Sequence, residues 1–209
     1  YPLRRQRQMC IRDSIHGFAA AGARVSHLAK EMTTILHGAV SRLARMGKPL
    51  VVAVNGPAAG AGLSLAMLGD IVIAAPTAHF TVAYTAIGLT PDLGASWLLP
   101  RLVGLRRAQE LALTNRRVGA QEAAAIGLIT HVADDPQAEA LTVAQRLAQG
   151  PGAALAGTRA LLARSLATGL EEQMEWEARA IATALRGQEG QEGIAAFLAK
   201  RAPDFSQPC

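Results

Sequence analysis

The 209-residue sequence is poor in cysteine and aromatic residues and has no long hydrophobic run. Its two cysteines, Cys10 and Cys209, stand near opposite ends of the chain, which excludes a disulfide framework and favours a reducing cytoplasmic location. The apolar stretches 50–54 and 71–75 are far shorter than the roughly 20 residues that a membrane-spanning helix needs. The basic opening segment lacks the apolar core of a secretory signal, so we predict a cytoplasmic protein without a membrane partner.

Beyond the first residues, the chain also has little net charge. The formal net charge is +5, but residues 1–14 contribute +3 of it, so the rest of the chain is close to neutral. Aromatic residues make up 4% of the sequence and are not interleaved with basic residues, which argues against a nucleic-acid partner. Residues 1–14 show no apolar periodicity, and we interpret them as a tail or an artefact outside the fold.

What the sequence does have is apolar patterning, since 50% of its residues are hydrophobic, enough for one domain with a sizeable core. Over residues 15–136, strand and helix patterns alternate, which predicts an α/β core. The strands are expected at 50–54, 71–75 and 79–82, and the helices at 28–46, 63–68, 96–103, 105–113 and 120–126. The first two strands are apolar on both faces and should be covered on both sides. Residues 137–209 carry only helical patterns.

A glycine-rich turn, residues 55–62, joins the strand at 50–54 to the next helix. The first amides of a helix have no intrahelical acceptor, and the helix dipole is positive at that end, so such a turn can bind an anion or a developing oxyanion. The same glycines can instead serve tight packing of strand against helix. The spacing of Gly56, Gly60 and Gly62 matches neither a dinucleotide fingerprint nor a Walker loop.

Asp92 lies in a Pro-Asp-Leu-Gly turn just ahead of the helix expected at 96–103. A carboxylate in that place has two interpretations. It can cap the helix by accepting a backbone N–H, or it can act as an acid/base group in a site. The turn alone leaves both open.

Three segments in this order resemble the enoyl-CoA hydratase/isomerase (crotonase) family: KPLVVAVNGPAAGAGLSLAMLGDIVIAAPTAHF, GLTPDLGASWLLPRLVG and NRRVGAQEAAAIGLITHVAD. Within the family the likeness is greatest to the 1,2-epoxyphenylacetyl-CoA isomerase group, partly through the ending EGIAAFLAKRAPDF. The resemblance implies a crotonase-like ββα spiral over residues 15–136. It also implies that the all-helical region 137–209 mediates trimerisation, giving a homotrimer or a dimer of trimers.

The resemblance implies an acyl-CoA thioester as substrate and no cofactor, because coenzyme A is part of the substrate, and no metal. The Ala61 amide would form half of an oxyanion hole for the thioester carbonyl. Hydratases of the family use two glutamates, whose positions are held here by Ser64 and Tyr84, whereas Asp92 matches an acidic position kept by isomerases. The implied reaction is therefore double-bond isomerisation with Asp92 as acid/base, and the alternative is hydration.

The resemblance also implies a set of substrate contacts. They are Gly60, Ala61, Ser64, Ala83, Tyr84, Leu89, Trp97 and Lys200, the last reaching the coenzyme A of a neighbouring subunit. Family members carry a further segment ahead of the helix at 28–46, with the second oxyanion-hole amide. We therefore expect a core truncated at its N-terminus, with uncovered core surface. A noncatalytic assembly subunit is the second alternative.

Overall fold

The computed structural model describes residues 17–206. The predicted tail at 1–14 and both cysteines lie outside the described residues. The helices are η1 Gly22–Arg24, α2 Val25–Arg45, α3 Ala61–Ala66, η2 Thr85–Ile87, α4 Ala95–Val103, α5 Leu105–Thr114, α6 Ala120–Ala125, α7 Pro136–Ala148, α8 Gly152–Ser165, α9 Leu170–Arg186 and α10 Gln188–Leu198. The strands are β1 Val51–Val54, β2 Ala58–Ala59, β3 Ile71–Ala74, β4 His79–Thr81, β5 Val118–Gly119 and β6 His131–Val132.

The strands form two three-stranded sheets. One has the order β1-β3-β6 and is parallel throughout, with Val51 opposite Ile71 and Ile73 opposite His131. The other has the order β2-β4-β5, in which β2 runs parallel and β5 antiparallel to β4. Parallel neighbours require crossover connections, and α3 supplies the one between β1 and β3. The α/β alternation predicted for residues 15–136 is thus present.

The first strand differs from the prediction that both of its faces are covered. Val54 is buried, but the other three residues of β1 are only partly buried. The reason is its place in the sheet, because within the described part of the chain β1 is an edge strand that pairs only with β3. The central strand β3 fits the expectation, with Val72, Ile73 and Ala74 buried.

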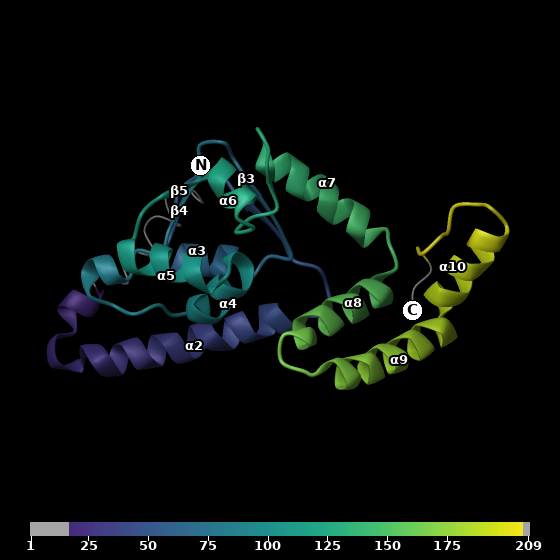
Figure 1. Ribbon diagram of the computed structural model, residues 1–209, viewed down its shortest axis with the longest axis horizontal. Coiled ribbons are helices and arrows are strands. Elements are labelled where there is room, and N and C mark those ends of the chain that lie inside the picture. Colours follow the sequence, from purple (N-terminus) through teal and green to yellow (C-terminus); the bar gives the residue numbers. More distant parts are fainter. Residues whose placement is uncertain (1–16, 207–209) are drawn as a thin grey trace.

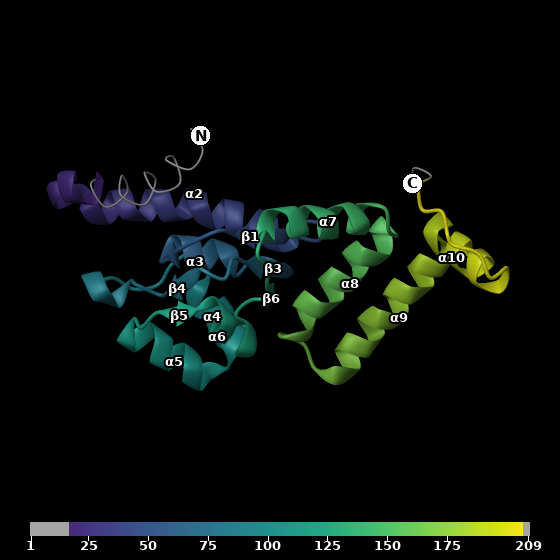
Figure 2. The same ribbon diagram turned by 90° about the horizontal axis from the view of Figure 1, so that it is seen from above.

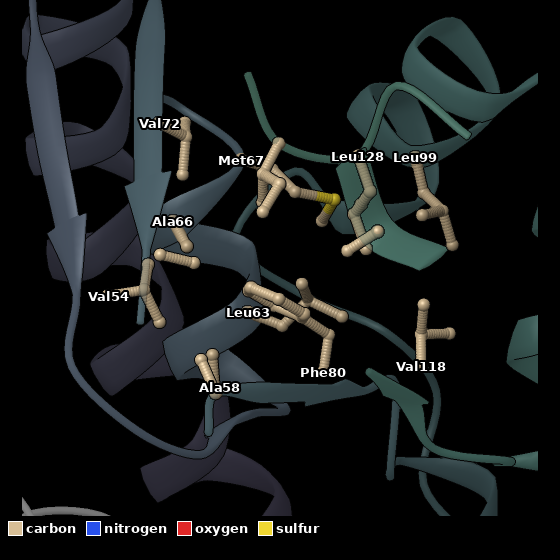
Figure 3. Packing of buried hydrophobic residues seen from close by; sticks show 14 of the residues in the cluster. Val54, Ala58, Leu63, Ala66, Met67, Val72, Phe80, Leu99, Val118 and Leu128 are labelled. Carbon is tan, nitrogen blue, oxygen red and sulfur yellow. The ribbon is translucent and has the colours of Figure 1, made fainter. Parts of the chain in front are cut away.

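The core lies between the two sheets and the helices that follow them. Figure 3 shows how Leu63 and Met67 from the α3 segment meet Phe80 of β4 and Leu128 beyond α6. Phe80 and Ile73 are among the largest side chains that are fully buried. This packing holds α3 at the carboxyl ends of β1 and β2. The N-terminus of α3, which follows the glycine-rich turn, is therefore held in one orientation.

Helix α2 carries the predicted apolar periodicity, yet none of its residues is buried, and Ile35 is 74% exposed. Its link to the core runs through a turn ahead of α4. There, a β-carbon added to Gly94 would lie 4.0 Å from Val40 Cγ1, and the His37 ring meets the Leu93 amide.

The C-terminal helices divide into two groups in Figures 1 and 2. Helix α7 packs on β1 and β3, while α8, α9 and α10 pack on one another at the far end of the molecule. The predicted all-helical character of residues 137–209 is confirmed within the described part, and the domain division at 136/137 stays a prediction. Among residues 17–206, no helix is long and apolar enough to cross a membrane.

Candidate active site

Three polar side chains predicted separately from the sequence come together in the structure. Ser64 is inside α3, Tyr84 immediately precedes η2, and Asp92 lies in the loop before α4. The Tyr84 hydroxyl donates a hydrogen bond of 2.5 Å to Asp92 Oδ1 and lies 3.1 Å from Ser64 Oγ. We call this group the Ser64–Tyr84–Asp92 triad.

Ser64 anchors the triad from inside the protein. Its side chain is fully buried, and its hydroxyl also lies within hydrogen-bond distance of two carbonyl oxygens, 3.2 Å from Gly60 and 3.3 Å from Asp92. A buried hydroxyl is stable only when it has such partners. Ser64 therefore joins the glycine-rich turn to the Asp92 loop.

Asp92 does not cap the helix that follows it. The N-cap of α4 is Gly94, without a side-chain cap, and Asp92 contributes only its backbone carbonyl, which accepts from the Ala95 amide at 3.0 Å. Its carboxylate turns toward Tyr84, and within the described residues Oδ2 makes no hydrogen bond. Of the two interpretations of Asp92, the helix cap is therefore not what the structure contains.

Tyr84 acts as a hydrogen-bond donor. Burial raises the pKa of its phenol to about 12, and the hydrogen bond to the Asp92 carboxylate adds to the shift. At neutral pH the phenol thus keeps its proton and donates a hydrogen bond to the Asp92 carboxyl group.

Two left-handed backbone conformations at non-glycine residues orient the triad. Ala83 has φ 65°, and the following Tyr84 amide donates to the Val82 carbonyl at 2.9 Å. Leu93, directly after Asp92, has φ 49°, and its amide donates to Nε2 of His37 at 3.2 Å. Such conformations cost on the order of 1–3 kcal/mol and persist where the surroundings fix them. The sequence reasoning missed His37, because no local pattern marks a contact across 56 positions.

The predicted oxyanion donor lies at the start of α3. Gly60 is the N-cap, with φ 52°, and its own amide donates to Thr81 at 3.2 Å. Ala61 is the first helical residue, and its amide has no hydrogen-bond acceptor among the described residues. An ideal β-carbon on Gly60 would lie 4.0 Å from Tyr84 Cζ, so the turn passes close to the triad.

The remaining predicted contacts are spread more widely. Ala83 adjoins Tyr84 and is partly buried, whereas Leu89 and Trp97 are each 46% exposed. The Trp97 ring lies under the Arg101 guanidinium, 4.0 Å away. Lys200 follows α10, at the opposite end of the molecule from α3 and α4 (Figure 1). The structure thus gathers Gly60, Ala61, Ser64, Ala83, Tyr84 and Asp92 and leaves Lys200 apart.

A large cavity in the molecule lies away from this chemistry. It measures about 1070 Å³ and lies among α8, α9 and α10. A smaller apolar cavity of about 310 Å³ lies between α4 and α5 and borders the Asp92 loop at Pro91 and Ala95. Within residues 17–206, no three His, Cys, Asp or Glu side chains are grouped to hold a metal ion.

The sequence matches a known family over almost its whole length. Residues 16–208 match the family model described as enoyl-CoA hydratase/isomerase. Among curated proteins, the chain is 58% identical over 74 residues to the 1,2-epoxyphenylacetyl-CoA isomerase of Escherichia coli (strain K12). That match covers 35% of this chain and 28% of the relative, so it spans little more than a quarter of the relative's length.

Solved structures match over a longer stretch. An enoyl-CoA hydratase from Polaromonas sp. JS666 superposes with a TM-score of 0.87 at 35% identity, covering 91% of this chain and 75% of that one. An enoyl-CoA hydratase/isomerase from Cupriavidus metallidurans CH34 gives a TM-score of 0.84 at 36% identity, covering 93% and 75%. These likenesses confirm the predicted crotonase fold with its C-terminal helical region.

Proposed function

The chain belongs to the enoyl-CoA hydratase/isomerase family, and from that premise we propose that it isomerises the double bond of an enoyl-CoA thioester with Asp92 as the acid/base. One observation carries the proposal. Asp92 supplies the only carboxylate of the triad, and the other two members are hydroxyl groups. The active protein is expected in the cytoplasm, and its substrate is an acyl-CoA.

Isomerisation needs one group that removes a proton and returns it elsewhere. With a β,γ-unsaturated acyl-CoA, Asp92 takes a proton from the α-carbon, and the electron pair of that bond forms the α,β double bond through an enolate. The former β,γ electron pair then accepts the same proton at the γ-carbon, so atoms and charge balance. During the reaction, negative charge develops on the thioester oxygen, where the unpaired Ala61 amide can donate.

Hydration is the less favoured alternative. Adding water across a double bond uses one group to activate the water and a second to handle the proton at the α-carbon. Tyr84 stands at one of the two expected glutamate positions, and a phenol with a pKa of about 12 keeps its proton at neutral pH. Ser64 stands at the other and is fully buried within its own hydrogen bonds. The triad thus lacks a second base.

Two further parts of the proposal concern binding and assembly. We propose that Ala83, Leu89 and Trp97 contact the acyl group, and that Lys200 pairs with coenzyme A phosphates on a neighbouring subunit. Large apolar side chains on α9 and α10 are exposed, including Ile181 at 59% and Phe197 at 82%, which supports burial of this face in a homotrimer or a dimer of trimers.

The proposal is tested by following formation of the conjugated product by absorbance with wild-type protein and Asp92→Asn. We expect the substitution to lower turnover by about 100-fold or more, because it removes the acid/base and keeps the shape of the side chain. Asp134→Asn is the matched control, since Asp134 is exposed and distant in sequence from the triad. Turnover retained in a folded Asp92→Asn variant would rule out Asp92 as the base. No turnover in wild-type protein would contradict the enzyme proposal and favour the assembly subunit.

A further inference from the structure

The side chains of the triad form a chain of hydrogen bonds. The sequence predicted these residues as separate contacts and did not predict the chain. The Tyr84 hydroxyl donates a hydrogen bond of 2.5 Å to Asp92 Oδ1, and its oxygen lies 3.1 Å from Ser64 Oγ. Because the Tyr84 proton points to Asp92, Ser64 is the donor wherever the two hydroxyls bond, although the carbonyls of Gly60 and Asp92 are also within reach of the Ser64 proton. Hydrogen bonds arranged in such a chain polarise and strengthen one another.

We propose that Tyr84 is a positioning residue, which holds Oδ1 of Asp92 so that Oδ2 is presented to the reacting carbons of the substrate. This inference rests on the proposed function for its chemistry. It replaces the expected role of the Tyr84 hydroxyl as a substrate contact, because that hydroxyl already has partners on both sides.

Two elements fix the Tyr84–Asp92 pair. Ser64 belongs to α3, which the buried core holds in place. The Asp92 loop is tied to α2 by the hydrogen bond that the Leu93 amide donates to Nε2 of His37. Among the described residues, Asp92 is the one charged group that acts on the Tyr84 phenol. Neighbouring elements therefore hold both members of the pair in place, and the Tyr84 hydroxyl joins the two side chains.

A positioning role has a kinetic consequence that differs from substrate binding. Loss of the phenol hydroxyl leaves Asp92 free to rotate, and misplacement of a reacting group by about 1 Å can cost roughly 100-fold in rate. The loss appears in kcat, because Asp92 acts in the chemical step, whereas loss of a substrate contact appears in KM.

The first test is Tyr84→Phe in the full chain. We expect kcat to fall by about 10-fold to 100-fold with KM unchanged. Incorporation of fluorotyrosine in a Tyr1→Phe background, where Tyr84 is the one remaining tyrosine, keeps the hydroxyl and should restore kcat. A raised KM with unchanged kcat would overturn the positioning role and restore Tyr84 as a substrate contact.

The second test needs no turnover, so its outcome is separate from that of the proposed function. In the Tyr1→Phe background, we expect a proton NMR signal from the Tyr84 hydroxyl, shifted downfield by the short bond to Asp92. Asp92→Asn should move this signal upfield, and Asp134→Asn should leave it in place. A signal unaffected by Asp92→Asn overturns the inference even in an active isomerase. A signal that moves supports the contact even where wild-type protein shows no turnover, and then the proposed function alone fails.

Discussion

At the scale of single residues, Gly69 is a tightly packed position outside the triad, in the short connection from α3 to β3. A β-carbon added there would lie 2.7 Å from Val72 Cγ2 and 2.8 Å from Val52 Cγ2. Distances this short do not occur between packed carbon atoms, and the two valines face each other on the paired strands β1 and β3. Gly69 is therefore required for space, since its φ is not in the left-handed region.

We predict that Gly69→Ala lowers the free energy of unfolding by about 1–3 kcal/mol, the usual cost of overpacking a core. The measurement is chemical denaturation followed by circular dichroism. Gly56→Ala is the matched control, because nothing lies within 4 Å of a β-carbon there. Equal free energies of unfolding of the two variants would show that β1 and β3 can move apart without loss of stability.

The three residues of the triad could be identified from the sequence, but the contacts between their side chains could not. Asp92 and the glycine-rich turn each have a local signal, and the family resemblance added Ser64 and Tyr84. That the Tyr84 hydroxyl bonds to the carboxylate depends on φ 65° at Ala83, which no local residue pattern announces. His37 was missed for the same kind of reason, since helical periodicity on α2 does not show which turn the ring meets.

At the scale of elements, Arg159 of α8 joins the C-terminal helices to the spiral. Its guanidinium donates to the carbonyls of Leu43, Ala44 and Met46 at 3.1, 2.9 and 2.7 Å, and to Asp70 Oδ2 at 2.6 Å. The last carbonyls of a helix have no intrahelical donor, so Arg159 satisfies the end of α2. Asp70 in turn accepts from the Leu50 amide at the entrance to β1. One side chain thus links α2, α8 and the first sheet.

Arg159→Met should lower the free energy of unfolding by about 2 kcal/mol, because it removes charge-assisted hydrogen bonds from a side chain that is only 12% exposed. Arg117→Met is the comparison, since Arg117 is exposed and its side chain has no partner among the described residues. Urea denaturation of both variants measures the difference. A loss of the same size in both would show that the Arg159 contacts contribute nothing specific.

The longer elements were predicted to within a few residues, and the two-residue strand β2 was not predicted at all. Helices α4 and α5 and strand β3 carry clear periodicity or apolar runs bounded by glycine or proline. Strand β2 consists of Ala58 and Ala59, which have no strand preference. It exists because the turn after β1 brings these residues beside Phe80 and Thr81 of β4.

At the scale of the whole molecule, the sequence patterns predicted the class of fold but not the arrangement of the helices in the last third of the chain. Helical periodicity over 137–209 does not separate α7, which packs on β1 and β3, from α8–α10, which pack on one another (Figure 2). Which surface a helix covers depends on contacts distant in sequence, such as those of Arg159. The prediction that both faces of β1 are covered was wrong for a related reason, because the residues of a strand do not show whether it lies at the centre or the edge of its sheet.

The central claim, that a site with one carboxylate isomerises and does not hydrate, is tested most directly by mass spectrometry. The protein is incubated with a β,γ-unsaturated acyl-CoA, and separately with its α,β-unsaturated isomer, in water labelled with heavy oxygen, and the masses of the acyl-CoA products are measured. We predict a conjugated product of unchanged mass with no label in its acyl chain. A product heavier by one labelled water would contradict the claim and identify a hydratase.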